Sequence, residues 1–456
     1  MVIRMNLIKK DRNNKIQKSR EIIKKEKKKI KEEKEKIKEQ KLQRFYQSKF
    51  GKNIKKFQKR NFIQKEDPKC ESKKMIKEKI LSVILFEVMG AIICLIILFI
   101  LSGGKNFIKL YGELNKLINV YDTITTSYYG NLDKNNMIDN AVNSMLSEVG
   151  DEYTNYSSKS DASSFLETVD GVYEGIGCMV SMDENNNIVI INIFDNSPAK
   201  KAGLKEKDII LKIDDQDYQG KTSNDMSNYV KNSKASKIKL TIKRDGEEKE
   251  ITVNRRKVEV PSISSEILEK DNKKVGYIDI SVFSAVTYEQ FKKELTKLEK
   301  KGIHALIIDV RNDSGGYLSA VTDISSLFLK KGKIIYQLED NNKKEIIKDK
   351  TKENRTYPIA VLVNKNSASA SEILASAIKE SYGGYVVGTQ TYGKGTVQKT
   401  KKLSDGSMIK YTIQKWLTPN NNWIDKEGVK PTNTVEYEIK DNVDLQLEKA
   451  LELVSK

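Results

Sequence analysis

The chain has 456 residues, enough for two to four domains at roughly 100–200 residues each, and its 38% hydrophobic content excludes a wholly disordered protein. Its formal net charge is +19, and residues 1–79 account for all of this excess, because they hold 30 Lys and Arg against 11 Asp and Glu. From Ile80 onward the charges balance. The basic composition therefore describes an N-terminal arm, and no nucleic-acid partner is expected.

Cysteine and histidine are scarce in this chain. The three cysteines, Cys70, Cys94 and Cys178, lie in segments of different character, so we expect no disulfide framework. The single histidine, His304, excludes a site of several histidines and any mechanism that needs two of them. We therefore expect no metal site and no cofactor.

A long apolar segment runs from Ile80 to Leu101. Its 22 residues carry one charge, Glu87, and at about 1.5 Å per residue they can cross a hydrocarbon core of about 30 Å. Sixteen of them are Leu, Ile, Val or Phe, which outweigh a cost of about 3 kcal/mol or less for Glu87. A transmembrane helix is expected. The alternatives are a buried core helix, which rarely lacks a polar face for so long, and a cleaved signal peptide, against which the 79 preceding residues argue.

The two flanks of this segment differ in charge. Residues 73–79 hold four lysines, whereas a lone Lys105 follows the segment closely. By the positive-inside rule we expect a single-pass protein of the cell membrane, with a cytoplasmic N-terminus and residues 102–456 outside. Whether the outer side is periplasmic or extracellular stays open.

The basic arm, residues 1–79, has a weak heptad pattern. Isoleucines recur every seven residues from Ile16 to Ile37, without the second apolar row that a coiled coil needs. The favoured interpretation is a solvated helix or a disordered tail whose lysines contact anionic lipid headgroups. Binding of RNA or of a cytoplasmic protein is the alternative.

Three segments of different pattern follow. Residues 102–165 show apolar side chains at helical spacing and are expected to form helices. Residues 166–258 contain short alternating runs typical of strands, with a hairpin turn at Asp245–Gly246. Residues 259–456 alternate buried-type strands, Val275–Ile280 among them, with helical stretches, which is an α/β pattern.

The middle segment contains the motifs Tyr173-Glu-Gly-Ile-Gly177, Asn196-Ser-Pro-Ala-Lys-Lys-Ala-Gly-Leu204 and Asp208-Ile-Ile-Leu. This set resembles a PDZ domain of the kind found in bacterial proteases. In such domains a Gly-Ile-Gly-type loop offers backbone N–H groups to the C-terminal carboxylate of a peptide that adds as a strand. The resemblance implies that Gly175, Ile176 and Gly177 form this loop. The alternative is that the glycines merely make a turn.

Four further motifs stand in order along the chain. They are Asp151-Glu-Tyr-Thr-Asn-Tyr156, Asp309-Val-Arg-Asn-Asp-Ser-Gly-Gly316, Val363-Asn-Lys-Asn-Ser-Ala-Ser-Ala-Ser-Glu-Ile-Leu-Ala375 and Gly388-Thr-Gln-Thr-Tyr-Gly-Lys-Gly-Thr-Val-Gln398. Together they resemble the carboxyl-terminal processing proteases, also called tail-specific proteases, over roughly residues 110–450. The resemblance implies an α/β core of the crotonase/Clp protease-like kind with an inserted β-rich PDZ domain. Together with the patterns above, the expected fold also has N-terminal helices and one transmembrane helix.

Three serines crowd the N-terminus of a helix expected to begin near Ser371, where developing negative charge is favoured. They are Ser367, Ser369 and Ser371. The resemblance implies that the middle one, Ser369, is the nucleophile. The run from Ser369 to Glu372 is also a capping-box pattern, in which the hydroxyl would only cap the helix.

A serine nucleophile needs a base, and His304, which opens an expected strand, is poorly placed for that role. Lys394 lies between two glycines, 25 residues after Ser369, and the resemblance implies that it is the general base. To work near neutral pH its pKa must lie well below about 10.4, which burial achieves. Gln398 matches the family residue that orients the lysine without holding it protonated.

The oxyanion formed during attack needs fixed hydrogen-bond donors. The resemblance implies the backbone N–H of Ala370 and one from Gly315 or Gly316. This chain has Ser314 where the family usually has proline, which loosens the expected turn. It also has Glu380 where an aspartate is common.

The resulting hypothesis is a membrane-anchored serine endopeptidase that recognises C-terminal tails of extracytoplasmic proteins through its PDZ domain and cleaves them. Its expected partners are proteins or peptides with free C-termini and the membrane, and assembly into a homo-oligomer stays open. One rival is a non-catalytic PDZ scaffold on a degenerate protease core. Another is that the basic arm carries the main function.

Overall fold

The structure is a computed structural model that describes residues 73–101, 107–341, 343–441 and 443–456. The chain divides into two compact units, residues 1–130 and residues 131–456. The predictions for the basic arm concern residues 1–79, and residues 1–72 lie outside the described part of the chain.

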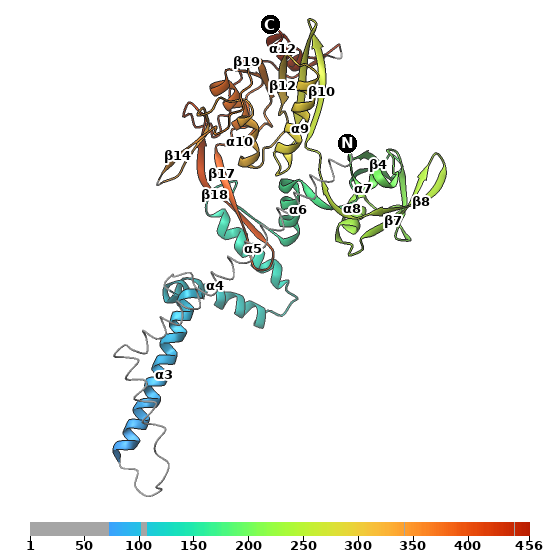
Figure 1. Ribbon diagram of the computed structural model, residues 1–456. Helices are drawn as coiled ribbons and strands as arrows, with labels where there is room; N and C mark the ends of the chain where they lie inside the picture. The colour runs from blue at the N-terminus through green and yellow to red at the C-terminus, as the bar shows by residue number, and fades with distance from the viewer. Residues whose placement is uncertain (1–72, 102–106, 342, 442) are drawn as a thin grey trace, which may run out of the picture. The chain divides into compact units, whose positions relative to one another are not determined.

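Two long helices make up the described part of the first unit. Helix α3 runs from Lys73 to Leu101 and α4 from Phe107 to Ser127 (Figure 1). The helix expected over the apolar segment is confirmed as a helix, and it begins within the lysine-rich flank. Its stretch Ile80–Ile97 is long and apolar enough to cross a membrane, and none of it is buried within the chain.

A six-stranded sheet forms the centre of the second unit (Figure 1). Its strands lie in the order β10 (Ile263–Lys270), β11 (Lys273–Ile280), β12 (Ala305–Asp309), β15 (Ile359–Val363), β16 (Tyr385–Gly388) and β19 (Asn433–Thr434). Every pair from β11 to β19 is parallel. All residues of β12 and β15 are buried, as their runs of apolar residues predict for a sheet covered on both faces, and Asp309 at the end of β12 is the one charged residue among them. The expected α/β alternation is confirmed.

Helices cover both faces of this sheet because alternate strand residues point to opposite sides. Leu306 and Ile308 pack in one cluster with α9 (Thr287–Lys300), α10 (Leu318–Ser326) and α11 (Ala370–Ala377), which continues as the π-helical turn η1 (Ile378–Tyr382). Ala305 and Ile307 pack in another cluster with α12 (Leu445–Val454). The sheet is therefore the middle layer of three.

A second sheet stands beside the first and was not predicted from the sequence. It contains β1 (Asn155–Ser157), β18 (Met408–Leu417), β13 (Ile334–Glu339) and β14 (Lys344–Lys348) in that order, with β17 (Thr396–Lys402) also paired to β18. A short hairpin of β20 (Ile439–Lys440) and β21 (Val443–Asp444) precedes α12. Residues 389–395 connect β16 to β17 and contain Lys394, and we call them the lysine loop. This loop ends where β17 joins the second sheet.

The inserted β-domain, residues 172–259, contains its own antiparallel sheet. The sheet and its two helices comprise β3 (Cys178–Met182), β4 (Ile188–Ile193), α7 (Pro198–Ala202), β5 (Ile209–Ile213), β6 (Gln216–Asp217), α8 (Ser223–Asn232), β7 (Lys237–Arg244) and β8 (Glu247–Asn254). The hairpin expected at Asp245–Gly246 is confirmed between β7 and β8.

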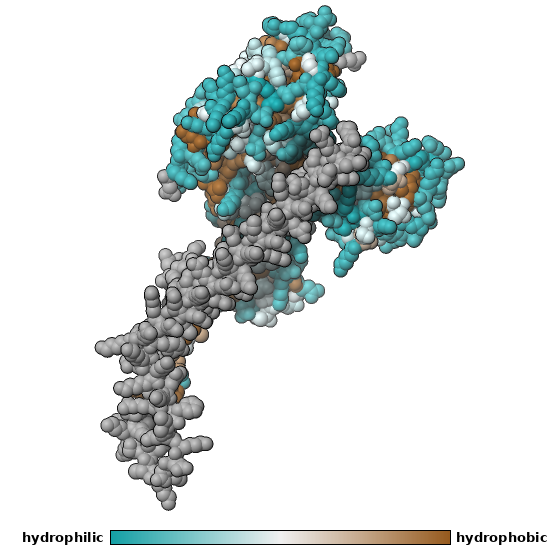
Figure 2. Space-filling view, in the orientation of Figure 1, coloured by the Kyte–Doolittle hydropathy of each residue, from teal (hydrophilic) through white to brown (hydrophobic). Residues whose placement is uncertain are grey.

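The inserted β-domain begins and ends at one short two-stranded ribbon. Its entering strand β2 (Val172–Gly175) pairs antiparallel with its leaving strand β9 (Arg256–Glu259). Before it come α5 (Lys134–Ser147) and α6 (Lys159–Asp170). The face of the second unit seen in Figure 2 is mostly hydrophilic, since the large apolar side chains of both domains form buried clusters.

Candidate active site

The structure separates the three candidate serines by their environment. Ser367 and Ser371 are fully buried, and their hydroxyls donate hydrogen bonds to the backbone carbonyls of Val310 at 2.7 Å and Asp313 at 3.0 Å. Ser369 is only half-buried and lines a cleft. Of the three, Ser369 alone has a hydroxyl that is available to a substrate.

The backbone of Ser369 is strained. Its φ of 54° and ψ of −110° fall in a region that costs a residue with a side chain about 1–3 kcal/mol. Helix α11 begins at the next residue, and the Ala370 N–H has no acceptor within the described part of the chain. The sharp turn at Ser369, which we call the serine turn, thus presents the Ser369 hydroxyl and the free Ala370 N–H at the same helix N-terminus.

Lys394 lies on the loop between β16 and β17. Its carbonyl accepts a hydrogen bond from the indole of Trp416 at 2.7 Å, and a Cβ on the preceding Gly393 would lie 2.9 Å from the Glu427 nitrogen. The loop therefore packs too closely for a side chain at Gly393. The ammonium group of Lys394 stands 4.8 Å from the ring centre of Tyr153.

Tyr153 belongs to the first of the four family-like motifs, for which the sequence suggested no chemical role. A cation over an aromatic face is attracted by the ring, so this contact favours the charged form of Lys394. Among the described residues, no hydrogen bond joins the Lys394 ammonium group to Ser369 or Gln398. Ser369 and Lys394 line the same cleft without a hydrogen bond between their side chains among the described residues.

The pKa of Lys394 is lowered, chiefly by burial, which penalises the charged ammonium, and next by the positive charge of Lys410. Carboxylates of Glu372, Asp151 and Glu152 act in the opposite direction. The net direction is the one that a general base needs. Lys410 lines the same cleft, with its ammonium group 5.4 Å from the ring centre of Phe165.

Gln398 lies on β17 at a bulge that interrupts the pairing with β18. Its amide nitrogen donates to the hydroxyls of Thr396 at 2.9 Å and Thr412 at 3.2 Å. The side chain lines the same cleft as Lys394, and its amide is engaged by one threonine of its own strand and one of β18.

Glu372 is the residue of this site whose importance the sequence did not reveal. The fully buried carboxylate accepts four hydrogen bonds, from the N–H groups of Ser369, Gly393 and Lys394 at 2.7–2.9 Å and from the Thr391 hydroxyl at 2.6 Å. The pKa of Glu372 is raised, because the effect of burial outweighs that of these four donors, which favour the ionised form. One side chain thus ties the serine turn to the lysine loop. The capping-box pattern indicated only the first of these four contacts.

The glycines expected to supply an oxyanion donor lie against the serine turn. A Cβ on Gly315 would stand 2.7 Å from the Ala368 carbonyl oxygen, and Gly315 has a φ of 97° that glycine adopts without strain. The Gly315 N–H donates to the Asp313 carboxylate at 2.8 Å. The next N–H, of Gly316, has no acceptor within the described residues.

A cleft of about 520 Å³ brings the predicted residues together. Ser369, Lys394, Gln398, Gly315 and Gly316 all line it, and apolar side chains form other parts of its walls. These walls include Phe165, Leu166, Val169, Val282, Leu318, Val397 and Trp416. The cleft therefore combines polar groups suited to acyl transfer with a lining suited to an apolar side chain.

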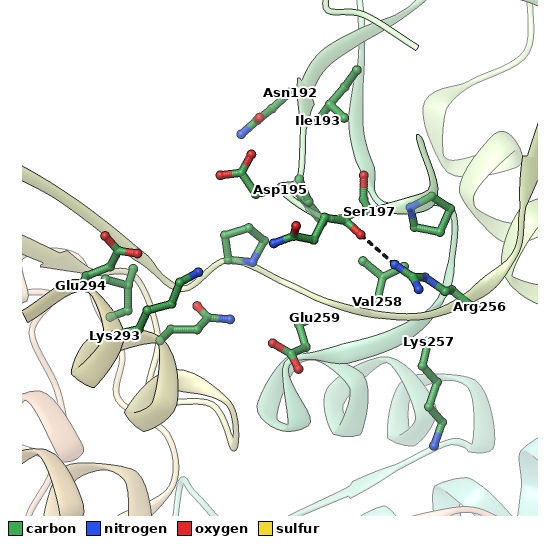
Figure 3. Close-up of a pocket in the computed structure, with 16 residues that line it drawn as sticks. Asn192, Ile193, Asp195, Ser197, Arg256, Lys257, Val258, Glu259, Lys293 and Glu294 are labelled. Carbon is green, nitrogen blue, oxygen red and sulfur yellow. Dashed lines mark hydrogen bonds between the residues drawn. The ribbon is translucent and has the colours of Figure 1, made fainter. Parts of the chain in front are cut away.

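A second hollow, of about 600 Å³, lies between the inserted β-domain and α9 (Figure 3). Lys293 and Glu294 line it from α9, and Asp195 and Ser197 line it from the β-domain. Arg256 closes one end, where its guanidinium donates to the Asn196 carbonyl at 2.7 Å. It contains none of the predicted site residues.

The expected peptide-binding loop joins β2 to β3. Ile176 is buried, its carbonyl accepts the Ala199 N–H at 2.8 Å, and its own N–H has no acceptor within the described residues. Gly177 has a φ of 82°, and a Cβ there would meet Ser197 at 2.4 Å. Gly175 ends β2 at the pairing with Arg256. This loop belongs to the inserted β-domain, residues 172–259, and no residue of that domain lines the cleft that contains Ser369.

Metal-binding groups do not gather anywhere in the described ranges, where no cluster of three or more His, Cys, Asp or Glu could hold an ion. His304 is exposed, and its backbone N–H donates to the Lys274 carbonyl next to β12. It lies at a strand end, as expected.

Comparison with known protein families matches three parts of the chain. The model of peptidase family S41 matches residues 274–435, that of the PDZ domain residues 175–254, and that of the N-terminal domain of the activating protease CtpB residues 102–161.

Individual relatives agree with these matches. The carboxy-terminal processing protease CtpB of Bacillus subtilis (strain 168) is 40% identical over 323 residues, 70% of this chain and 67% of the relative. CtpA of the same organism is 37% identical over 321 residues, 70% of this chain and 68% of the relative. The solved structure of a photosystem II D1 C-terminal processing protease is 24% identical, with a TM-score of 0.44, over 77% of this chain and 92% of that one.

Proposed function

The chain belongs to the carboxy-terminal processing proteases of peptidase family S41, which are serine-type peptidases, and from this premise we propose that it cleaves by a Ser369/Lys394 mechanism. The observation that carries the proposal is the single cleft that Ser369, Lys394 and Gln398 line together. The strain at Ser369 and the lowered pKa of Lys394 support it, because a nucleophile and its base both need such tuning.

In the proposed reaction, neutral Lys394 accepts the proton of the Ser369 hydroxyl as the oxygen attacks the substrate carbonyl. The N–H groups of Gly316 and Ala370 stabilise the oxyanion. Protonated Lys394 then gives the proton to the leaving amine, and water hydrolyses the acyl-enzyme by the reverse sequence. Lys394 must leave the ring of Tyr153 to reach Ser369, and Gln398 then orients it.

Substrates are peptides or proteins, and we propose that the PDZ domain selects them by a free C-terminus. The unpaired Ile176 N–H beside Gly177 supports this assignment, because a carboxylate needs such donors. The apolar walls of the serine cleft favour an apolar side chain next to the cleaved bond. The core is proposed to be crotonase/Clp protease-like, supported by its sheet, which is parallel from β11 to β19 and has helices on both faces.

Cleavage of an unstructured protein tests this function directly. The full chain is expected to cut it near the C-terminus, as located by mass spectrometry, and the Ser369→Ala variant is expected to leave it intact. A substrate with an amidated C-terminus should be cut much more slowly, because amidation removes the carboxylate and leaves the cut site unchanged. No cleavage by the full chain would favour the non-catalytic rival, and equal cleavage by Ser369→Ala would show that Ser369 is not the nucleophile. Equal cleavage of both substrates would remove the role of the PDZ domain.

We also propose that α3 anchors the protein in the cell membrane, with the basic arm inside near anionic lipid and the peptidase outside acting on extracytoplasmic proteins. The apolar stretch Ile80–Ile97 and the lysines before it support this orientation. Protease added to intact cells should digest the part after Gly104 and spare residues 1–79. Digestion of the arm under these conditions would reverse the proposed topology.

A further inference from the structure

Asp313 is a buried carboxyl group beside the proposed oxyanion donors. Its side chain is fully inaccessible, and it lies in the turn that follows β12. One carboxyl oxygen, Oδ1, accepts the Gly315 N–H at 2.8 Å. The other, Oδ2, is buried with no hydrogen-bond partner among the described residues. An ionised carboxylate with an unpartnered oxygen is costly in such a place.

The backbone of Asp313 is hydrogen-bonded to the serine turn. Its carbonyl accepts the Ala368 N–H and the Ser371 hydroxyl, each at 3.0 Å. Ala368 and Ser371 flank the strained Ser369. Asp313 therefore bonds on one side to the serine turn and on the other to the Gly315–Gly316 turn, so its position sets their separation.

Burial raises the pKa of Asp313 to about 8, although Gly315 and Ser371 favour the ionised form. The like charge of Asp279, on β11, adds to the rise. The other charged groups nearby are already engaged: Asp309 of β12 is paired with Arg311 at 2.6 Å, and Glu372 of α11 is held by its four donors.

We propose that Asp313 is a positioning residue that holds the Gly315–Gly316 turn against the serine turn while its carboxyl group is protonated, and that its ionisation switches the peptidase off. A negative charge there would repel the developing oxyanion and draw Oδ2 toward new donors, displacing the turn. The inference rests on the proposed function and adds a pH control to it.

The pH dependence of cleavage tests the switch. In the full chain, kcat/KM for a peptide with a free C-terminus should rise as Lys394 loses its proton, then fall above about pH 8, roughly tenfold for each further pH unit. Asp313→Asn imitates the protonated group, so the rise should remain and the fall should disappear. Asp279→Asn removes the like charge, so the fall should begin at lower pH. An unchanged fall in Asp313→Asn overturns the proposal.

Thermal unfolding tests the protonation without any activity. In the unfolded chain Asp313 ionises above about pH 4, and in the folded chain only near pH 8. The stability that this proton confers is present below pH 4 and is lost as the pH rises toward 8. The Tm of Asp313→Asn minus that of the wild type should therefore grow from pH 5 to pH 8 and then level off.

The two measurements separate two failures. A Tm difference that does not change with pH shows that Asp313 carries no proton, and overturns the proposal whatever the activity. A changing Tm difference with no Ser369-dependent cleavage in either chain removes the proposed function and the switch with it, while leaving Asp313 a buried protonated carboxyl.

Discussion

Replacement of Lys394 by arginine is expected to lower kcat/KM by about 10²–10⁴-fold, the usual loss when a general base is removed. A guanidinium stays protonated at any working pH, so it cannot accept the proton of the Ser369 hydroxyl. It can still stack on the ring of Tyr153, 4.8 Å from the lysine ammonium group, so the variant should fold normally. Peptide cleavage and thermal unfolding, measured together, distinguish lost chemistry from lost structure.

Lys410→Arg is the matched control, because Lys410 lines the same cleft and acts on Lys394 through its charge alone. Arginine preserves that charge, so this variant should keep most of the activity. Retention of more than about a tenth of wild-type activity by Lys394→Arg would show that Lys394 is not the base.

Replacement of Glu372 by glutamine should damage both stability and activity. The amide nitrogen would face two of the four donors that the carboxylate accepts, and each buried donor left without an acceptor costs about 1–3 kcal/mol. We expect the free energy of unfolding to fall by about 2–4 kcal/mol. Activity should fall by about 10²-fold, since the serine turn and the lysine loop lose the group that joins them.

Glu380→Gln is the control for this change. Glu380 lies in the π-helical turn that continues α11, and its carboxylate accepts one N–H, of Asn420, at an exposed site. A surface change of this kind should alter the free energy of unfolding by no more than about 0.5 kcal/mol. Denaturant titration and kcat/KM compare the two variants. If Glu372→Gln behaves like Glu380→Gln, the two loops are held together by other contacts.

Local features of the fold could be predicted from the sequence. The strands β12 and β15 could be predicted because they are runs of apolar residues, with Asp309 at the end of β12 the one charged exception. The hairpin could be predicted because Asp245 and Gly246, a pair that readily adopts positive φ, separate two strand-like runs. The start of helix α11 could be predicted for the same reason, because the capping residue Ser369 and its partner Glu372 are only three residues apart. These signals depend on neighbours along the chain.

The assembly of the candidate site could not be predicted from the sequence, because it depends on contacts between distant segments. Glu372 meets Gly393 and Lys394 because β15 and β16 are adjacent parallel strands whose carboxyl ends bring the following loops together. In the second sheet, Asn155 of β1 pairs with Lys410 of β18. This pairing places Tyr153 beside the ammonium group of Lys394, although the two residues lie more than two hundred positions apart in the sequence. Such contacts are fixed by the packing of whole elements, and no local pattern encodes them. For the same reason, the burial that leaves Asp313 without a partner for Oδ2 could be found only in the folded chain.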